Sequence, residues 1–403
     1  IKFYHITSMA VLIKFSMILE STSIISNYSN LEEFIMSSET IYLPVEKLFS
    51  FMKDVFIGCG VPADEAAVCA EVLITSDRRG IESHGIGRLK MYFDHIQNGT
   101  QLPTTNFEIV RESPTTAVID GHHGMGQVIG VHSMELAISK ARQYGMGAVA
   151  VRNSTHFGIA GYYPLMAIKA GMIGMAFTNA RPSIAPTFSV QAMMGTNPIS
   201  FGAPTDEDCP FLFDAATSIT QRGKFEVLAR KGIPAKPGWA IGPSGETLTD
   251  AEEVLRAFSK DAAALLPLGG AGEDLAGYKG YGLAAIVEIL SASLQQGKFL
   301  WNLSGVSSEG KSQPNCLGHF FMAIQVEAFC SLNDFKHSTG EIIRQLRAAR
   351  KAPGASRIFS AGEKEYIAEQ ETAIRGIPVV PNLQKDIKIM QQALQLNQYQ
   401  FPF

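Results

Sequence analysis

Hydrophobic side chains recur at steps of three and four residues near the start of the chain, which is the spacing of one buried helix face. The first such run consists of Val45, Leu48, Phe49, Met52 and Phe56. A turn rich in glycine ends this run, and similar spacing then predicts two further helices, over about 63–76 and 86–97. This part of the chain is therefore predicted to be helical.

Beyond residue 115, short runs rich in β-branched residues alternate with helical patterns. Strands are predicted at 116–119, 147–151, 172–178 and 210–213, and helices at 128–141, 160–171, 281–294, 334–349 and 362–375. Alternation of strands and helices is typical of α/β folds. We therefore expect a helical domain built from both chain ends, residues 36–115 plus 330–403, and an α/β domain of residues 116–329.

The first 35 residues carry an apolar run, from Met9 to Leu19, followed by sequence rich in serine, asparagine and threonine. The run is shorter than the roughly 20 residues that span a bilayer, and Lys14 interrupts it. It also lacks a clear signal-peptide cleavage site. We interpret residues 1–35 as a disordered or upstream-translated extension and Met36 as the true start, and we expect no membrane partner.

Composition narrows the classes of function. The chain has 403 residues, which is enough for more than one hydrophobic core. Its formal net charge of -4 offers no basic field, so no nucleic-acid partner is expected. The five cysteines are scattered and form no C-x-x-C pair, which argues against a disulfide framework and favours a reducing, cytoplasmic location.

Two stretches match the dinucleotide fingerprint G-x-G-x-x-A, at Gly58–Ala63 and Gly145–Ala150. The fingerprint requires a strand before the glycines and a helix after them. The first stretch joins two predicted helices, and the second leads from a helix into a strand. A dinucleotide would therefore bind to this chain without a Rossmann fold.

Ser83, His84, Arg88 and Tyr92 form the first candidate site. Steps of four residues on a helix would place His84, Arg88 and Tyr92 on one face, beside the loop that precedes the helix. An arginine fork matches a carboxylate, hydroxyls orient a ligand, and a histidine can donate to a carbonyl oxygen. In the competing interpretation, Ser83 only caps the helix and the charged residues are solvated.

His156 is the second candidate, because it follows a predicted strand and precedes a predicted helix. Ligands of α/β proteins gather at the carboxyl ends of strands. Histidine has an ordinary pKa near 6.5, which suits the proton transfer that accompanies reduction of a carbonyl. A lone histidine can equally be structural.

Three glycine-containing turns are candidate cradles for phosphate or ribose, since glycine lets the backbone approach a ligand and a helix N-terminus attracts anions. They are Phe213–Thr217, Tyr278–Gly282, which contains Lys279, and Ser360–Glu365. Ordinary turns would explain all three. No metal site is predicted, because His122 and His123 adjoin with no further ligand at suitable spacing.

Six runs occur in a characteristic order: Asp77–Leu89, Asp120–Gln127, Asn153–Gly158, Gly195–Pro198, Phe213–Thr217 and Tyr278–Leu283. Together they resemble the malate/L-lactate dehydrogenase family of the non-Rossmann type, over about residues 42–396. That family also holds ureidoglycolate, sulfolactate and cyclic-imine-reducing members. The resemblance implies a mixed, largely antiparallel sheet in the cofactor domain, and a homodimer with its active site near the subunit interface.

The resemblance also assigns residues. His156 would be the general acid/base, while Ser83, His84, Arg88 and Tyr92 would line the pocket for substrate and nicotinamide. NAD or NADP would contact His84, Ala180, Asp214, Ala215, Ala216, Lys279, Gly362, Glu363 and Lys364. The chain departs from relatives at Ala180, where some have a serine, and at Ala361, which replaces a common proline.

The leading hypothesis is an NAD(P)-dependent oxidoreductase that moves a hydride between its cofactor and a small 2-oxo or 2-hydroxy acid, of malate or L-lactate type. Arg88 would hold the 1-carboxylate. Reduction of a cyclic imino acid is one alternative, which a substrate panel separates. A non-catalytic dinucleotide-binding paralogue is another, and the presence of His156 and Lys279 argues against it. The acid and the choice between NAD and NADP stay open at this point.

Overall fold

The computed structural model describes residues 39–258 and 260–403. They form two compact units, one of residues 44–377 and one of residues 39–43 with 378–403. The predicted extension of residues 1–35 lies outside the described residues. The division into a helical domain and an α/β domain, drawn from the sequence at residues 116 and 330, stays a prediction.

The smaller unit holds the end of the chain. Strand β1 (Ile41–Leu43) pairs with β12 (Ile377–Val379), and helix α13 (Pro381–Ala393) follows. The side-chain amide of Gln384 donates to the carbonyls of Glu39 and Val379, at 2.8 and 2.9 Å. These bonds connect the first turn of α13 to the end of β12 and to the residues that precede β1.

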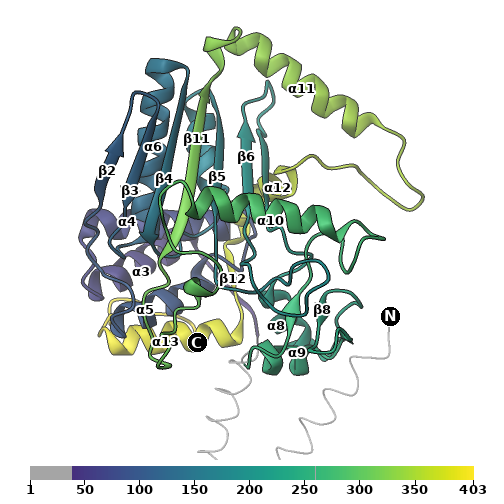
Figure 1. Cartoon of the computed structure of the whole chain (residues 1–403). Helices are drawn as coiled ribbons and strands as arrows, with labels where there is room; N and C mark the ends of the chain where they lie inside the picture. Colours follow the sequence, from purple (N-terminus) through teal and green to yellow (C-terminus); the bar gives the residue numbers. More distant parts are fainter. Residues whose placement is uncertain (1–38, 259) are drawn as a thin grey trace, which may run out of the picture. The chain divides into compact units, whose positions relative to one another are not determined.

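The larger unit is built on a seven-stranded sheet (Figure 1). In spatial order its strands are β2 (Glu108–Glu112), β3 (Thr116–Asp120), β4 (Met146–Ser154), β11 (Leu317–Gln325), β5 (Met172–Thr178), β6 (Ile199–Ala203) and β7 (Phe211–Ala215). β3 and β4 run parallel, and the other neighbouring pairs are antiparallel. The expected mixed, largely antiparallel sheet is therefore confirmed.

Helices cover both faces of this sheet. α6 (Gly126–Tyr144) and α7 (Tyr162–Lys169) pack on one face, and α10 (Gly277–Ala292) crosses the other (Figure 1). A large hydrophobic core lies under α6 and α7, and its buried side chains include Ile129, Val149, Tyr163 and Phe321. A Cβ on Gly147 would lie 2.1 Å from the carbonyl oxygen of Ala137, so glycine at this position allows α6 to approach β4 closely.

The helices predicted near the start are confirmed as α3 (Val45–Gly58), α4 (Ala63–Arg78) and α5 (Leu89–Gln97). The third one differs in its first turn. Residues Ile86–Arg88 form a separate 3₁₀ turn, η1, and the α-helix begins only at Leu89. α4 packs against both α3 and α6, and so connects these helices to the sheet layer.

A lobe of residues 221–268 follows β7, and the sequence did not predict its elements. It contains α8 (Arg222–Lys231), α9 (Ala251–Phe258) and the short strands β8 (Ala240–Ile241), β9 (Thr247–Leu248) and β10 (Ala264–Leu265), around buried Phe225 and Val254. The remaining elements are η2 (Leu300–Leu303), η3 (Val326–Ala328) and the predicted helices α11 (Leu332–Ala348) and α12 (Glu363–Arg375). In the part of the chain that the structure describes, no helix has the length and apolarity needed to cross a membrane.

Candidate active site

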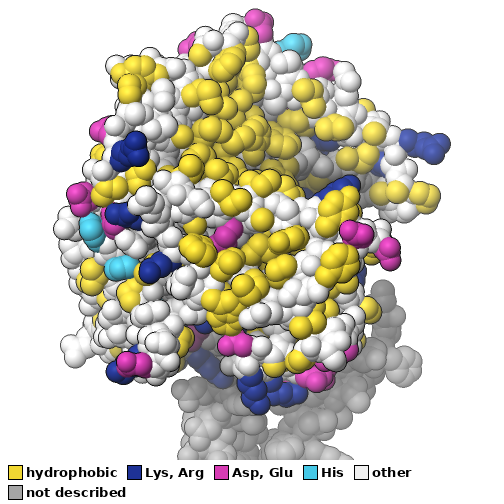
Figure 2. Space-filling view, viewed as in Figure 1, with side chains coloured by type: hydrophobic (Ala, Val, Ile, Leu, Met, Phe, Trp, Pro, Cys, Tyr) yellow, Lys and Arg dark blue, Asp and Glu magenta, His cyan; other side chains and the backbone are white. Residues whose placement is uncertain are grey.

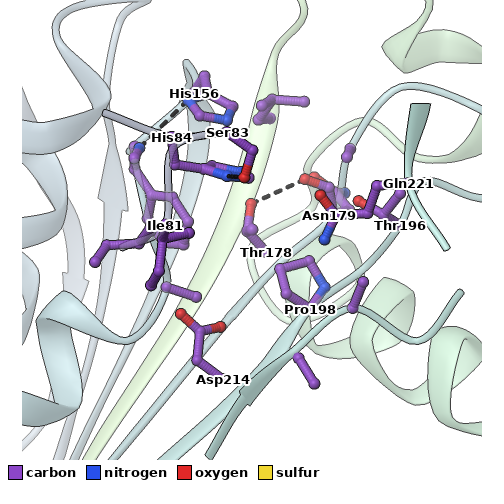
Figure 3. A pocket seen from close by; sticks show the side chains of 18 of the residues that line it. Ile81, Ser83, His84, His156, Thr178, Asn179, Thr196, Pro198, Asp214 and Gln221 are labelled. Atoms are coloured by element: carbon purple, nitrogen blue, oxygen red, sulfur yellow. Dashed lines mark hydrogen bonds between the residues drawn. The ribbon is translucent and has the colours of Figure 1, made fainter. Parts of the chain in front are cut away.

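The candidate active site lies at the carboxyl ends of three strands of the seven-stranded sheet, β4, β5 and β7. β4, β5 and β7 run in one direction while β6 and β11 run in the other, so the ends of the first three meet the starts of the other two here. A cavity opens at these strand ends (Figure 3). Its volume is about 870 Å³ when the open solvent at its mouth is counted. Its lining includes Ser83, His84, His156, Thr178, Asn179, Ala180, Asp214, Ala215 and Ala216. Residues from distant parts of the sequence therefore converge on one cavity.

His156 lies just beyond the end of β4, as the sequence predicts. Its Nδ1 is 2.5 Å from the hydroxyl oxygen of Tyr92 on α5, and its ring stacks on that of His84 with centroids 5.6 Å apart. Within the described part of the chain, Nε2 of His156 has no hydrogen-bond partner. One ring nitrogen is thus held in place, and the other is available to a ligand.

The surroundings of the two imidazoles keep them neutral. Burial lowers the pKa of His156 well below its usual range, and the neighbouring His84 and Arg88 lower it further. Burial, with a contribution from Arg88, also lowers the pKa of His84 to about 4. Burial raises the pKa of Tyr92, so its hydroxyl keeps its proton. In the free protein at neutral pH, His156 is therefore a base.

Ser83, His84 and Arg88 lie on the segment between α4 and α5. The Ser83 hydroxyl is 2.8 Å from Nδ1 of His84, and Nε of Arg88 donates to the Ser83 carbonyl at 2.7 Å. The terminal nitrogens of Arg88 have no partner among the described residues. A carboxylate could therefore still accept two hydrogen bonds from this guanidinium.

The expectation that His84, Arg88 and Tyr92 share one helix face is wrong. His84 lies in a turn, Arg88 ends η1, and Tyr92 is on α5. The reason lies at Gly85, whose ψ of -140° is not helical, so the chain changes direction before η1 begins. His84 and Tyr92 still contact His156, but tertiary packing brings them together rather than helical spacing. Arg88 does not line the cavity and is attached to its edge through the Ser83 carbonyl.

A second hollow adjoins the first and shares Ile81, Ile159, Asp214 and Glu365 with it. Gly362 and Lys364, predicted cofactor contacts, line this second hollow at the start of α12. The Asp214 carboxylate accepts a hydrogen bond from the Gly161 amide at 2.7 Å. Its side chain opens on the cavity, yet surrounding protein desolvates it enough to raise its pKa to about 6. The two hollows together form an elongated site.

Two of the predicted cofactor residues lie outside both hollows. Lys279 is exposed on the first turn of α10, with Nζ 5.8 Å from the Tyr278 ring centroid. Glu363 is buried, and its carboxylate accepts hydrogen bonds from the Ser360 amide at 2.9 Å and from Arg357. Glu363 therefore braces the turn that carries Gly362. The direct cofactor contacts of these two residues stay predictions.

A buried histidine that the sequence did not single out supports the sheet side of the cavity. His319, on β11, places Nδ1 2.8 Å from the Thr178 hydroxyl and Nε2 2.8 Å from the Ser154 hydroxyl. Its ring stacks on Phe157, which follows His156 in the chain, at a centroid distance of 4.4 Å. Burial lowers the pKa of His319 to about 3, so the ring stays neutral.

Other cavity residues could have been found from the sequence. Thr178 and Asn179 end a predicted strand, so the rule that singled out His156 applies to them as well. Thr196 and Glu365 lie in runs that the sequence singled out, Gly195–Pro198 and Ser360–Glu365, although neither was named as a site residue. Gln221 carried no signal, because a turn brings it to the cavity.

His122 and His123, in the turn between β3 and α6, do not line the cavity. Asp120, two residues before His122, accepts hydrogen bonds from Nε of Arg152 at 2.8 Å and from the Asn153 amide at 2.9 Å. The bond to Asn153 joins two of the six characteristic runs, Asp120–Gln127 and Asn153–Gly158, beside the end of β4. The described residues contain no group of three or more histidine, cysteine, aspartate or glutamate side chains placed to bind a metal ion.

Known proteins resemble this chain in sequence and in structure. The family model of malate/L-lactate dehydrogenase matches residues 43–388. A malate dehydrogenase of Pyrococcus horikoshii is 44% identical over 339 residues, covering 84% of this chain and 91% of that protein. An L-sulfolactate dehydrogenase of Methanocaldococcus jannaschii is 36% identical over 349 residues, covering 85% and 94%.

The fold agrees with these matches. The crystal structure of malate dehydrogenase from Entamoeba histolytica superposes with a TM-score of 0.87 at 42% identity, covering 91% of this chain and 100% of that one. The family match extends over most of the chain and includes all the elements that line the cavity. This chain therefore belongs to the malate/L-lactate dehydrogenase family.

Proposed function

We propose that this protein is an NAD(P)-dependent 2-hydroxy-acid dehydrogenase of malate or L-lactate type. The observation that carries the proposal is the convergence of Ser83, His84 and His156 on one cavity, with the Tyr92 hydroxyl behind the His156 ring. Membership of the family supports a hydroxy-acid dehydrogenase. The 44% identity to a malate dehydrogenase favours malate as the first substrate to test.

The elongated site suits a nicotinamide dinucleotide in its lining. Its two hollows adjoin and share Ile81, Ile159, Asp214 and Glu365, so one extended ligand could occupy both. Gly362 opens α12 with φ of +85°, and the start of a helix favours a phosphate. Ala180, Asp214, Ala215, Ala216, Gly362 and Lys364 would hold the cofactor, which when bound would accept or supply the hydride.

The residues of this chain would then handle the acid and the proton. Arg88 would bind the 1-carboxylate through its terminal nitrogens, which no described residue engages, and Ser83 would orient the substrate. In oxidation, the ring proton of neutral His156 would be on Nδ1, which would donate to the Tyr92 hydroxyl oxygen, and Nε2 would accept the proton of the 2-hydroxyl group. In reduction, the imidazolium would return the Nε2 proton to the substrate oxygen. Tyr92 would keep the ring in position through Nδ1.

The charge of the bound substrate would also change the pKa of His156. The pKa of His156 is low partly because Arg88 is nearby. A carboxylate bound to Arg88 would offset that positive charge and raise the pKa of His156, because an opposite charge favours the protonated imidazole. Binding of the oxo acid would therefore favour the protonated form that reduction requires.

A substrate panel tests the proposed function. Initial rates are measured with NADH and with NADPH against oxaloacetate, pyruvate, sulfopyruvate, glyoxylate derivatives and a cyclic imine. We expect the turnover of a 2-oxo acid to exceed that of the cyclic imine. Preference for the imine would indicate a cyclic imino-acid reductase, and cofactor binding without any turnover would indicate a non-catalytic paralogue.

We also propose that the protein is cytoplasmic and acts as a homodimer. Apolar side chains gather on the face that α10 lines (Figure 2), among them the exposed Leu283, Ile286 and Ile289. α11 likewise exposes Ile342 and Leu346. Exposed apolar patches of this kind mark protein interfaces. Sedimentation equilibrium should show twice the chain mass, and a monomer at micromolar concentration would contradict the proposed dimer.

A further inference from the structure

The segment that carries Ser83 and His84 is attached to the end of α4 through a buried carboxylate. Asp77, in the last turn of α4, is 4% exposed. Its Oδ2 accepts a hydrogen bond from the Ile86 amide at 2.7 Å. Asp77 does not line the cavity, so it acts on the segment and not on a ligand.

The neighbouring contacts show how closely the segment follows the helix end. The Ser76 hydroxyl donates to the Ile81 carbonyl at 2.7 Å, and the Ile81 amide donates to the Ser76 carbonyl at 2.9 Å. A Cβ on Gly85 would lie 1.8 Å from Oδ1 of Asp77, so the carboxyl group occupies the space beside this glycine. One end of the segment is thus held by Ser76 and the other by Asp77.

An aspartate at this position is unfavourable for the helix itself. The C-terminus of a helix carries partial negative charge, and burial of a carboxyl group costs free energy. Burial and the nearby Glu82 raise the pKa of Asp77 to about 8, against the opposing effect of the Ile86 amide. Ionisable groups that are buried despite this cost in free energy are concentrated at functional sites.

We propose that Asp77 is a positioning residue for the reaction, whose hydrogen bond to the Ile86 amide sets the place of Ser83, His84 and Arg88 relative to His156. The inference rests on the proposed function, because these are the groups assigned to the substrate. A misplacement of about 1 Å at such groups can cost on the order of 100-fold in rate.

The test compares Asp77→Ala with Asp77→Asn. Alanine removes the acceptor, and we expect the KM for the oxo acid to rise about 10- to 100-fold. Asparagine keeps an acceptor oxygen of the same size and resembles the uncharged carboxyl that predominates at pH 7, so it should restore the KM to within about threefold. Gly85→Ala, which displaces the carboxyl group, should resemble Asp77→Ala.

Asp64→Ala is the matched control, since Asp64 is exposed in the first turn of the same helix and should leave the KM unchanged. Thermal unfolding is followed in parallel, because a purely structural role would reduce the amount of folded enzyme and lower kcat without a change in KM. That result in Asp77→Ala, or equal losses in the asparagine and alanine variants, would contradict the inference. A wild-type protein without turnover would instead contradict the proposed function, and the inference with it.

Discussion

The two sides of the cavity are held in different ways. On the sheet side, His156 and Thr178 lie at strand ends, packed against the His319 ring and the hydrophobic core under α6 and α7. On the other side, Ser83 and His84 lie on a turn that is held by a few hydrogen bonds to the end of α4. We infer that the sheet side determines proton transfer and therefore kcat, whereas the loop side determines how the substrate acid binds and therefore KM.

The largest effect is expected on the sheet side, from His156→Ala. Without a positioned base or acid, kcat should fall by about 10²- to 10⁴-fold, the usual contribution of general acid–base catalysis. Cofactor binding, measured by fluorescence titration, should be retained. Near-normal turnover in a variant that still binds cofactor would make His156 a structural residue and transfer the proton-donor role to His84.

The support behind the sheet side is tested by His319→Ala. The substitution leaves the Ser154 hydroxyl without this partner and opens a cavity beside Phe157, so the free energy of unfolding should fall by about 2–4 kcal/mol. Urea denaturation measures this loss. The KM for the oxo acid should stay near the wild-type value, and a large increase would show that the two sides are not independent.

The loop side is tested by Arg88→Lys, because an ammonium cannot reproduce the paired hydrogen bonds of a guanidinium. The value of kcat/KM should fall by an amount equivalent to about 1.5–3 kcal/mol, mainly through KM. Arg142→Lys, on the exposed side of α6, is the matched control. Steady-state kinetics that match this control would identify Arg88 as an ordinary surface charge.

The smallest effect is expected from removing residues 1–35. Their apolar run is too short to span a membrane, and its pattern does not continue into the first predicted helix. Truncation to Met36 should leave both sides of the cavity, and therefore the kinetic constants, unchanged. Loss of soluble, active enzyme after truncation would overturn this expectation.

The sequence predicted the elements whose patterns are local. β4 and α6 have clear period and length, and His156 was recognised because it follows β4 directly. β11 was missed, although it lies between β4 and β5, because its pairing joins segments far apart in sequence. His319 was missed with it.

The candidate site shows the same limit. Ser83, His84, Arg88 and Tyr92 were named together, but their grouping depends on the non-helical Gly85 and on the bond from Ile86 to Asp77. Neither feature has a periodic signature in the sequence. Side-chain contacts between distant segments therefore decide the geometry that residue spacing only suggested.

The pH dependence of kcat/KM in the two directions tests the role of His156 most directly. Reduction requires the protonated imidazole of the free enzyme, and the pKa of His156 is lowered below its usual range. Reduction should therefore slow as pH rises above that pKa, by about tenfold per pH unit. Oxidation requires the neutral ring, so it should be constant above the same pKa and fall below it. Identical pH profiles in both directions, or an unchanged reduction profile in His156→Ala, would contradict the assignment of His156 as the acid/base group.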